Sequence, residues 1–210
     1  MELLDWVLHV DAHLREYVLA NGALVYALLF AIVFGETGFV VTPFLPGDSL
    51  LFAVGALAAD QLLDVNAATL TLFAAAVLGN TANYWIGRWI GPKVFHYESS
   101  RWFDHAHLLR AHAFFEQYGG KAVVLSRFIP IVRTFVPFVA GVGTMDAWRY
   151  AYYNVLGAVA WIATFLGSGY LVGNVPVVKE NLEYLVIAIV VVSVTPVVWG
   201  AWQARRVDRG

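Results

Sequence analysis

Three long stretches of this chain contain no Asp, Glu, Lys or Arg, and this feature constrains the fold more than any other. They are residues 65–87, 150–178 and 184–204, which hold 23, 29 and 21 residues. A helix needs about 20 apolar residues to cross the hydrocarbon core of a membrane. Only 13% of the chain is charged, against about a quarter in soluble domains. The sequence therefore excludes a soluble globule and predicts an all-α integral membrane protein.

We expect about three full transmembrane spans, over 65–87, 150–172 and 184–204, the last within an additional segment 180–204. The second stretch ends early because Gly173, Asn174 and Pro176 predict a turn. Lys and Arg are concentrated in the central loop and after residue 204. By the positive-inside rule the central loop and the C-terminus are cytoplasmic, and the acidic N-terminus lies outside.

Two further apolar segments, 22–60 and 121–145, are interrupted by polar and turn-forming residues. Neither half of either segment is long enough to span the bilayer. Broken backbone at membrane depth requires protein or a watery cavity around it. We therefore expect two re-entrant hairpins of broken helix; the alternative, which hydropathy leaves open, is that 17–35 is a plain spanning helix. The residues expected to support the hairpin turns are Pro43, Pro46, Gly47, Pro130 and Pro137.

The same order of elements occurs twice, which predicts an inverted repeat within one membrane domain. An amphipathic helix at 3–19, the hairpin 22–60 and the span 65–87 form the first repeat, 1–90. An amphipathic helix at 102–118, the hairpin 121–145 and the span 150–172 form the second, 99–173. The two hairpins would enter from opposite sides, an arrangement that many transporters use to build a binding site at the midplane.

Away from their terminal residues Asp60 and Lys121, the two predicted hairpins contain four charged residues: Glu36 and Asp48 in the first, Arg127 and Arg133 in the second. A charge at bilayer depth is costly, so each is a candidate functional residue. The planar guanidinium group binds phosphate bidentately and keeps its proton, which predicts phosphate binding by the arginines. The proton affinity of a buried carboxyl group depends on whether an arginine is paired with it, which predicts proton coupling through the acids. The alternative is a pair of purely structural salt bridges.

Other classes of function fit the sequence less well. The chain has no Cys, and its six His residues do not form a four-ligand zinc pattern, so we expect neither a metal nor another cofactor. No His lies within an apolar segment to serve as a base, and no metalloprotease motif is present; we expect no enzymatic activity. The net charge of -2 excludes nucleic acid as a partner. A proton- or cation-coupled transporter of small ions remains an alternative.

The chain also resembles a known family through motifs that occur in order along nearly its whole length. They are Phe34-Gly35-Glu36-Thr37-Gly38, Thr42-Pro43-Phe44-Leu45-Pro46-Gly47-Asp48-Ser49, Gly119-Gly120-Lys121, Ser126-Arg127-Phe128-Ile129-Pro130-Ile131-Val132-Arg133-Thr134 and Ala140-Gly141. In these residues the sequence is similar to the DedA family of bacterial inner-membrane proteins. That family is related to the eukaryotic VTT-domain scramblases, also called the SNARE-associated Golgi protein family.

This resemblance implies a lipid transporter (flippase) of the inner membrane that returns undecaprenyl phosphate to the cytoplasmic leaflet for cell-envelope synthesis. It implies coupling to the proton motive force. The family's acidic pair matches Glu36 and Asp48, and its essential arginines match Arg127 and Arg133. The expected partners are membrane lipids, a polyprenyl phosphate and protons. A phospholipid scramblase and a homodimer both remain open, because members of one family can differ in cargo.

Overall fold

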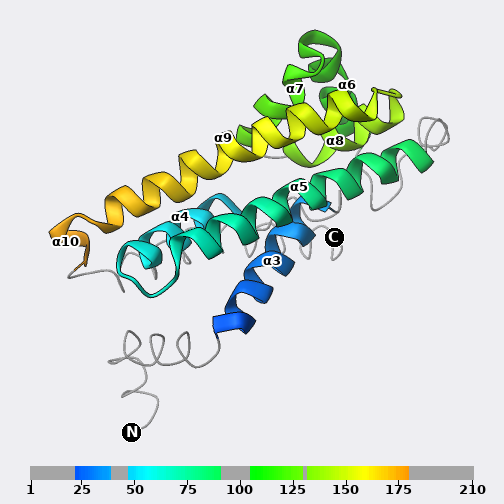
Figure 1. The fold of residues 1–210 in the computed structure, drawn as a ribbon. Coiled ribbons are helices and arrows are strands. Elements are labelled where there is room, and N and C mark those ends of the chain that lie inside the picture. The colour runs from blue at the N-terminus through cyan, green and yellow to red at the C-terminus, as the bar shows by residue number, and fades with distance from the viewer. Residues whose placement is uncertain (1–21, 39–46, 91–104, 130–131, 180–210) are drawn as a thin grey trace, which may run out of the picture. The chain divides into compact units, whose positions relative to one another are not determined.

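The computed structural model of this protein describes residues 22–38, 47–90, 105–129 and 132–179. All regular elements in these ranges are helices, coloured along the chain in Figure 1. The N-terminal amphipathic helix and the third span that the sequence predicts lie outside the described residues. In chain order the elements are α3 (Gly22–Gly38), α4 (Gly47–Ala59), α5 (Val65–Ile90), α6 (His105–Tyr118), α7 (Lys121–Leu125), the 3-10 turn η2 (Ser126–Phe128), α8 (Val132–Val142), α9 (Ala147–Gly173) and α10 (Pro176–Lys179).

Two of these helices, α5 and α9, are long and apolar enough to cross a membrane. They contain 26 and 27 residues, which at 1.5 Å per residue corresponds to roughly 40 Å each. These are the first two spans that the sequence predicts, each extended by a few residues. In α5 the helix continues through Arg88 to Ile90, and in α9 it begins at Ala147 instead of residue 150. The predicted turn after Gly173 separates α9 from α10.

An aspartate caps the N-terminus of each long helix. The Asp64 carboxylate accepts a hydrogen bond from the Ala67 amide at 2.7 Å, and the Asp146 carboxylate accepts one from the Arg149 amide at 2.9 Å. In both cases the acceptor precedes the helix and the donor is its third residue, the usual N-cap geometry.

We expect Asp64→Ala to lower the free energy of unfolding by about 1 kcal/mol, because an amide of α5 loses its acceptor. Asp64→Asn keeps an acceptor oxygen at the same place and should retain most of the stability. Denaturant unfolding in detergent, followed by tryptophan fluorescence, measures both. Equal losses for the two variants would contradict a capping role.

The chain divides into two compact units that are interleaved along the sequence. The first unit comprises Met1–Leu29, Phe44–Thr71 and Ala163–Gly210, and the second comprises Phe30–Pro43 and Leu72–Ile162. Helices α3, α5 and α9 therefore each contribute residues to both units.

In the first unit α4 packs closely against the C-terminal part of α9. A Cβ atom on Gly55 would lie 2.1 Å from the Leu166 carbonyl oxygen, and one on Gly169 would lie 2.1 Å from the Phe52 carbonyl oxygen. Only glycine permits the two backbones to approach this closely. Gly167-Ser168-Gly169 is a sequence of small residues typical of helix contacts in membranes; Gly169 makes such a contact, whereas nothing lies within 4 Å of a Cβ on Gly167.

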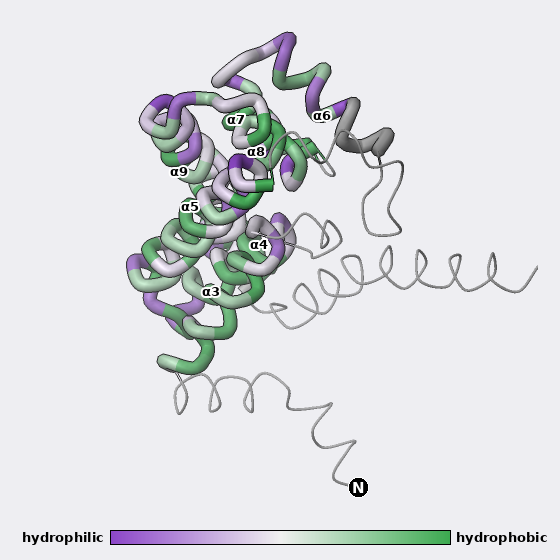
Figure 2. The backbone as a smooth tube through the Cα atoms, turned by 90° about the vertical axis from the view of Figure 1, so that its right-hand side faces the viewer, coloured by the Kyte–Doolittle hydropathy of each residue, from purple (hydrophilic) through white to green (hydrophobic). Residues whose placement is uncertain are grey.

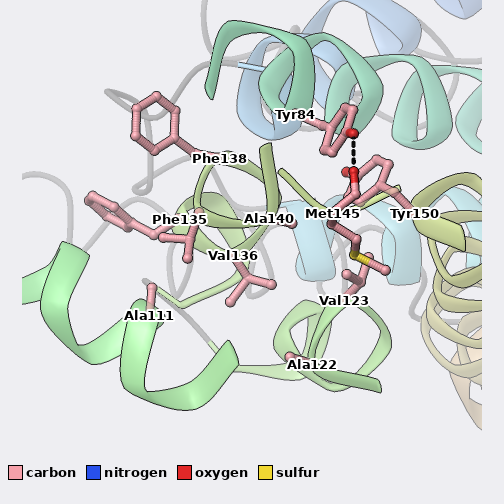
Figure 3. Packing of buried hydrophobic residues seen from close by; sticks show 11 residues of the cluster. Tyr84, Ala111, Ala122, Val123, Phe135, Val136, Phe138, Ala140, Met145 and Tyr150 are labelled. Carbon is pink, nitrogen blue, oxygen red and sulfur yellow. Dashed lines mark hydrogen bonds between the residues drawn. The ribbon is translucent and has the colours of Figure 1, made fainter. Parts of the chain in front are cut away.

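In the second unit α6, α7 and α8 pack around a hydrophobic core together with α5 (Figure 3). Tyr84 of α5 and Tyr150 of α9 stack with their ring centroids 4.2 Å apart. The Tyr84 hydroxyl donates a hydrogen bond to the Met145 carbonyl at 2.5 Å, the dashed line in Figure 3. This contact joins α5 to the turn between α8 and α9. Figure 2 shows α3 as mostly hydrophobic and α6 as alternating between hydrophilic and hydrophobic residues, the amphipathic pattern expected there.

The predicted hairpin segments each contain two helical parts within the described residues. The first contains α3 and α4, and the second contains α7 with η2, followed by α8. Pro137 was expected in a turn, and this expectation is wrong: it lies inside α8. An interior proline removes one helical hydrogen bond and its ring crowds the carbonyl four residues earlier, and this 11-residue helix nevertheless continues past Pro137. Gly47 is the first residue of α4. Pro43, Pro46 and Pro130 lie outside the described residues.

Candidate functional site

The second unit contains a small, mostly enclosed cavity between its helices. Its volume is about 10 Å³, which is room for about one water molecule. Helices α3, α5, α8 and α9 and the turn η2 each contribute to its wall. The lining residues are Glu36, Thr37, Asn80, Arg127, Arg133, Thr134 and Trp161. The cavity therefore brings together residues from both predicted hairpins and from both long helices.

Glu36 of α3 and Arg133 of α8 form an ion pair in this wall. A terminal guanidinium nitrogen of Arg133 donates a hydrogen bond to Oε1 of Glu36. The Glu36 side chain is 1% exposed and the Arg133 side chain is 10% exposed. Burying charges so far from solvent is costly, and pairing them with an opposite charge reduces that cost. The two residues are 97 positions apart in the sequence, so this pair fastens one predicted hairpin to the other.

Arg127 of η2 lines the same cavity and contacts a different set of groups. Its terminal nitrogen Nη2 donates to Oδ1 of Asn154 at 2.7 Å and lies 3.3 Å from the Ala76 carbonyl oxygen. The guanidinium carbon lies 5.9 Å from the centre of the Trp161 ring, within the range of a cation–π interaction. The residue is 3% exposed. Among the described residues, the polar contacts of this buried cation are with neutral groups.

Buried amide side chains of α5 and α9 organise the surroundings of the cavity, and sequence reasoning missed them. Asn83 is fully buried, and its Nδ2 donates to the Thr134 carbonyl at 2.8 Å and to the Thr37 carbonyl at 3.3 Å. It thus joins the last turn of α3 to the first turn of α8. Asn154 likewise joins two elements: its Oδ1 accepts a hydrogen bond from Arg127 of η2, and its Nδ2 donates one to the Val77 carbonyl of α5. A search of the predicted spans for polar as well as charged side chains would have found these amides.

Of the four charged residues expected at the site, three line one cavity: Glu36, Arg127 and Arg133. Asp48 lies in the first turn of α4, which belongs to the other unit. Trp161 of α9 is 2% exposed and is also part of the cavity wall. Within the described ranges, His, Cys, Asp and Glu side chains form no group of three that could hold a metal ion.

This arrangement can provide two guanidinium groups to an anion, provided that one of them exchanges its carboxylate partner. A phosphate group is several times larger than one water molecule, so it cannot enter the cavity as it stands. Binding an anion between the arginines therefore requires the Glu36–Arg133 pair to open. In the described geometry the site is closed, because Glu36 and Arg133 are paired with each other.

Comparisons with known proteins agree with these observations. Residues 45–171, more than half of the chain, match the model of the VTT domain. The chain is 49% identical over 196 residues to Protein DedA of Escherichia coli K12, covering 92% of this chain and 90% of that protein. It is 40% identical over 175 residues to an uncharacterized membrane protein of Mycobacterium leprae, covering 83% of this chain and 78% of that protein.

A third relative, the inner membrane protein YqjA of Escherichia coli K12, is 32% identical over 223 residues, and the match covers the whole of both chains. No solved structure matches. The matched domain includes Arg127 and Arg133, while the high identity to DedA extends over most of the remaining sequence. On this evidence the chain is an integral membrane protein of the VTT-domain, or DedA, family.

Proposed function

We propose that this protein is a flippase for a lipid phosphate in the bacterial inner membrane, with undecaprenyl phosphate as its cargo and the proton gradient as its energy source. One observation supports the proposal above all others: the buried Glu36–Arg133 ion pair shares a cavity with a second buried cation, Arg127. The names of the relatives support the location, because one of them is called an inner membrane protein.

Two arginines at one cavity suit a phosphate headgroup better than a monovalent cation. Each guanidinium group offers a planar fork of donors that matches two phosphate oxygens. A cation pathway needs carboxylate or carbonyl oxygens along its length, whereas two of the seven residues in this wall are positively charged. Burying cations is costly unless an anion joins them, and here the cargo supplies that anion.

Proton coupling follows from the exchange of partners at Arg133. When Glu36 takes up a proton, its attraction to Arg133 falls and the guanidinium group becomes available to a phosphate. When Glu36 loses the proton, it takes Arg133 back and the phosphate is released. Asp48 serves in this scheme as a second proton-carrying group. The predicted orientation, with the central loop and C-terminus in the cytoplasm, makes the cytoplasmic leaflet the side of release.

The test is transport in liposomes that contain the purified protein and fluorescently labelled undecaprenyl phosphate. Leaflet exposure is measured with a membrane-impermeant quencher, with and without a pH gradient. Faster exchange than in protein-free liposomes, increased by the gradient, is expected. No exchange of undecaprenyl phosphate would contradict the proposal; equal exchange of labelled phosphatidylethanolamine would favour a phospholipid scramblase instead.

We expect Arg133→Lys to slow this transport about tenfold or more, because an ammonium group cannot form the bidentate contact of a guanidinium group. The matched control is Arg149→Lys, the same change at an exposed position in the first turn of α9. The control should transport like the wild type. Full transport by Arg133→Lys would favour the alternative of a small-ion pathway, in which the arginine only balances charge.

A further inference from the structure

The two arginines of the cavity are held in different ways. Arg133 is paired with a carboxylate, Glu36. The described polar partners of Arg127 are the Asn154 side-chain oxygen and the Ala76 carbonyl. A carboxylate partner competes with an incoming phosphate for the guanidinium group, whereas an amide oxygen orients that group without neutralising it.

The orientation of Asn154 is fixed by its own hydrogen bonds. Its Nδ2 donates to the Val77 carbonyl at 3.0 Å and to the Thr81 hydroxyl oxygen at 3.1 Å. The Thr81 hydroxyl in turn donates to the Val77 carbonyl at 2.7 Å. With the two amide protons used on α5, the side-chain oxygen must face Arg127. Asn154 is fully buried, so solvent does not compete for its side-chain oxygen.

Gly157, one turn after Asn154 in α9, provides the space that Arg127 occupies. A Cβ atom at this position would lie 3.0 Å from both Cδ and Nε of Arg127, and 3.2 Å from the Val124 Cα atom. Residues three apart lie on the same face of a helix, so Asn154 and Gly157 together form the surface of α9 that Arg127 contacts. A methyl group at Gly157 would require the Arg127 side chain to shift by a few tenths of an ångström, which disturbs the hydrogen bond between its guanidinium group and Asn154.

We propose that Asn154 and Gly157 are positioning residues that keep Arg127 as a permanently charged, preoriented binding group for the phosphate of the lipid. In this assignment, which rests on the proposed function, the two arginines have separate roles. Arg127 binds the headgroup in every cycle, and Arg133 changes partner between Glu36 and the headgroup. Preorientation raises affinity because the group does not need to be ordered on binding.

The experiment compares Gly157→Ala with Gly167→Ala, the same substitution on the same helix at a position where a Cβ meets nothing within 4 Å. Binding of undecaprenyl phosphate and of undecaprenol, its uncharged counterpart, is measured in detergent by quenching of tryptophan fluorescence. Gly157→Ala should bind the phosphate about tenfold more weakly than Gly167→Ala, because a charge-assisted contact is misplaced. Both variants should bind undecaprenol equally.

Equal phosphate affinity in the two variants would overturn this assignment and leave the proposed function intact. An equal loss for the phosphate and for undecaprenol would also overturn it, since a general disturbance of the fold affects both lipids. If the wild type itself does not prefer the phosphate to the alcohol, the proposed function is wrong and the assignment with it.

A second variant, Asn154→Asp, tests the importance of a neutral partner and decides the matter if Gly157→Ala does not fold. It preserves the size of the side chain and an oxygen facing Arg127, but it places a carboxylate against the cation. A structural salt bridge would tolerate or favour this change. We expect the phosphate affinity to fall at least about tenfold while undecaprenol binding is retained; unchanged phosphate affinity would overturn the assignment.

Discussion

Glu36→Leu is expected to lower the free energy of unfolding by about 3–5 kcal/mol, because it leaves the buried Arg133 cation without its carboxylate. The side chain that is removed is 1% exposed and the cation that remains is 10% exposed, so water replaces the lost partner poorly. Unfolding in detergent, followed by tryptophan fluorescence against denaturant concentration, measures the loss. A variant as stable as the wild type would show that the pair contributes nothing to the fold.

The double variant Glu36→Leu with Arg133→Met separates structure from function. Replacing both members of a buried ion pair by apolar side chains of similar size is often neutral or stabilising, so most of the stability should return. Transport should not return, because the double variant lacks both Arg133, which binds the headgroup, and Glu36, which accepts the proton. Transport at the wild-type rate by the double variant would mean that the pair is only a structural salt bridge.

Gly141→Ala should lower the stability by about 1–3 kcal/mol or more, since there is no room for its methyl group. A Cβ on Gly141 of α8 would lie 2.0 Å from the Tyr84 carbonyl oxygen and 2.8 Å from the Arg88 amide nitrogen, both backbone atoms of α5. Gly87 is the reciprocal position on α5, where a Cβ atom would lie 2.2 Å from the Phe138 carbonyl oxygen. The two helices therefore touch through their backbones and would have to separate.

The control for this prediction is again Gly167→Ala. Alanine favours a helix over glycine by about 1 kcal/mol, so this control should be as stable as the wild type or slightly more stable. The midpoints of thermal unfolding in the same detergent make the comparison. Equal midpoints for Gly141→Ala and the control would mean that α5 and α8 are not in backbone contact.

The long helices could be predicted from the sequence because charged residues mark their limits. Asp64 and Arg88 flank the first charge-free stretch, and the helix observed there is α5. The prediction was too short at Arg88 and Arg149, because it ended each span at the first charge. An Arg residue can remain in the helix at the edge of the apolar region, because its long side chain carries the charge out to water. The Asp146 cap shows where helix α9 begins.

The site could be predicted in part. The rule that charges are costly at bilayer depth identified Glu36, Arg127 and Arg133, which line one cavity. It missed Asn83 and Asn154, because an uncharged amide does not interrupt a hydropathy pattern. The prediction that Pro137 supports a turn was wrong, because a proline was interpreted as a break. The helix α8 continues past it.

The closest backbone contacts could not be predicted at all. Gly87 and Gly141 meet each other's helices across more than 50 residues of sequence, and a single glycine gives no indication of which segment it faces. Gly157 is a similar case, since the side chain that needs its space belongs to Arg127, 30 positions earlier. Such pairings depend on how the helices dock, which is information that no local pattern contains.

The interleaving of the two units has a consequence for biosynthesis. The first unit includes both α4 and the part of α9 that begins at Ala163, and these pack through Gly55 and Gly169. A nascent chain that has reached only Ile162 therefore contains α4 without the part of α9 that packs against it. The packing of α4 against α9 is completed only once the chain as far as Gly173 has left the ribosome.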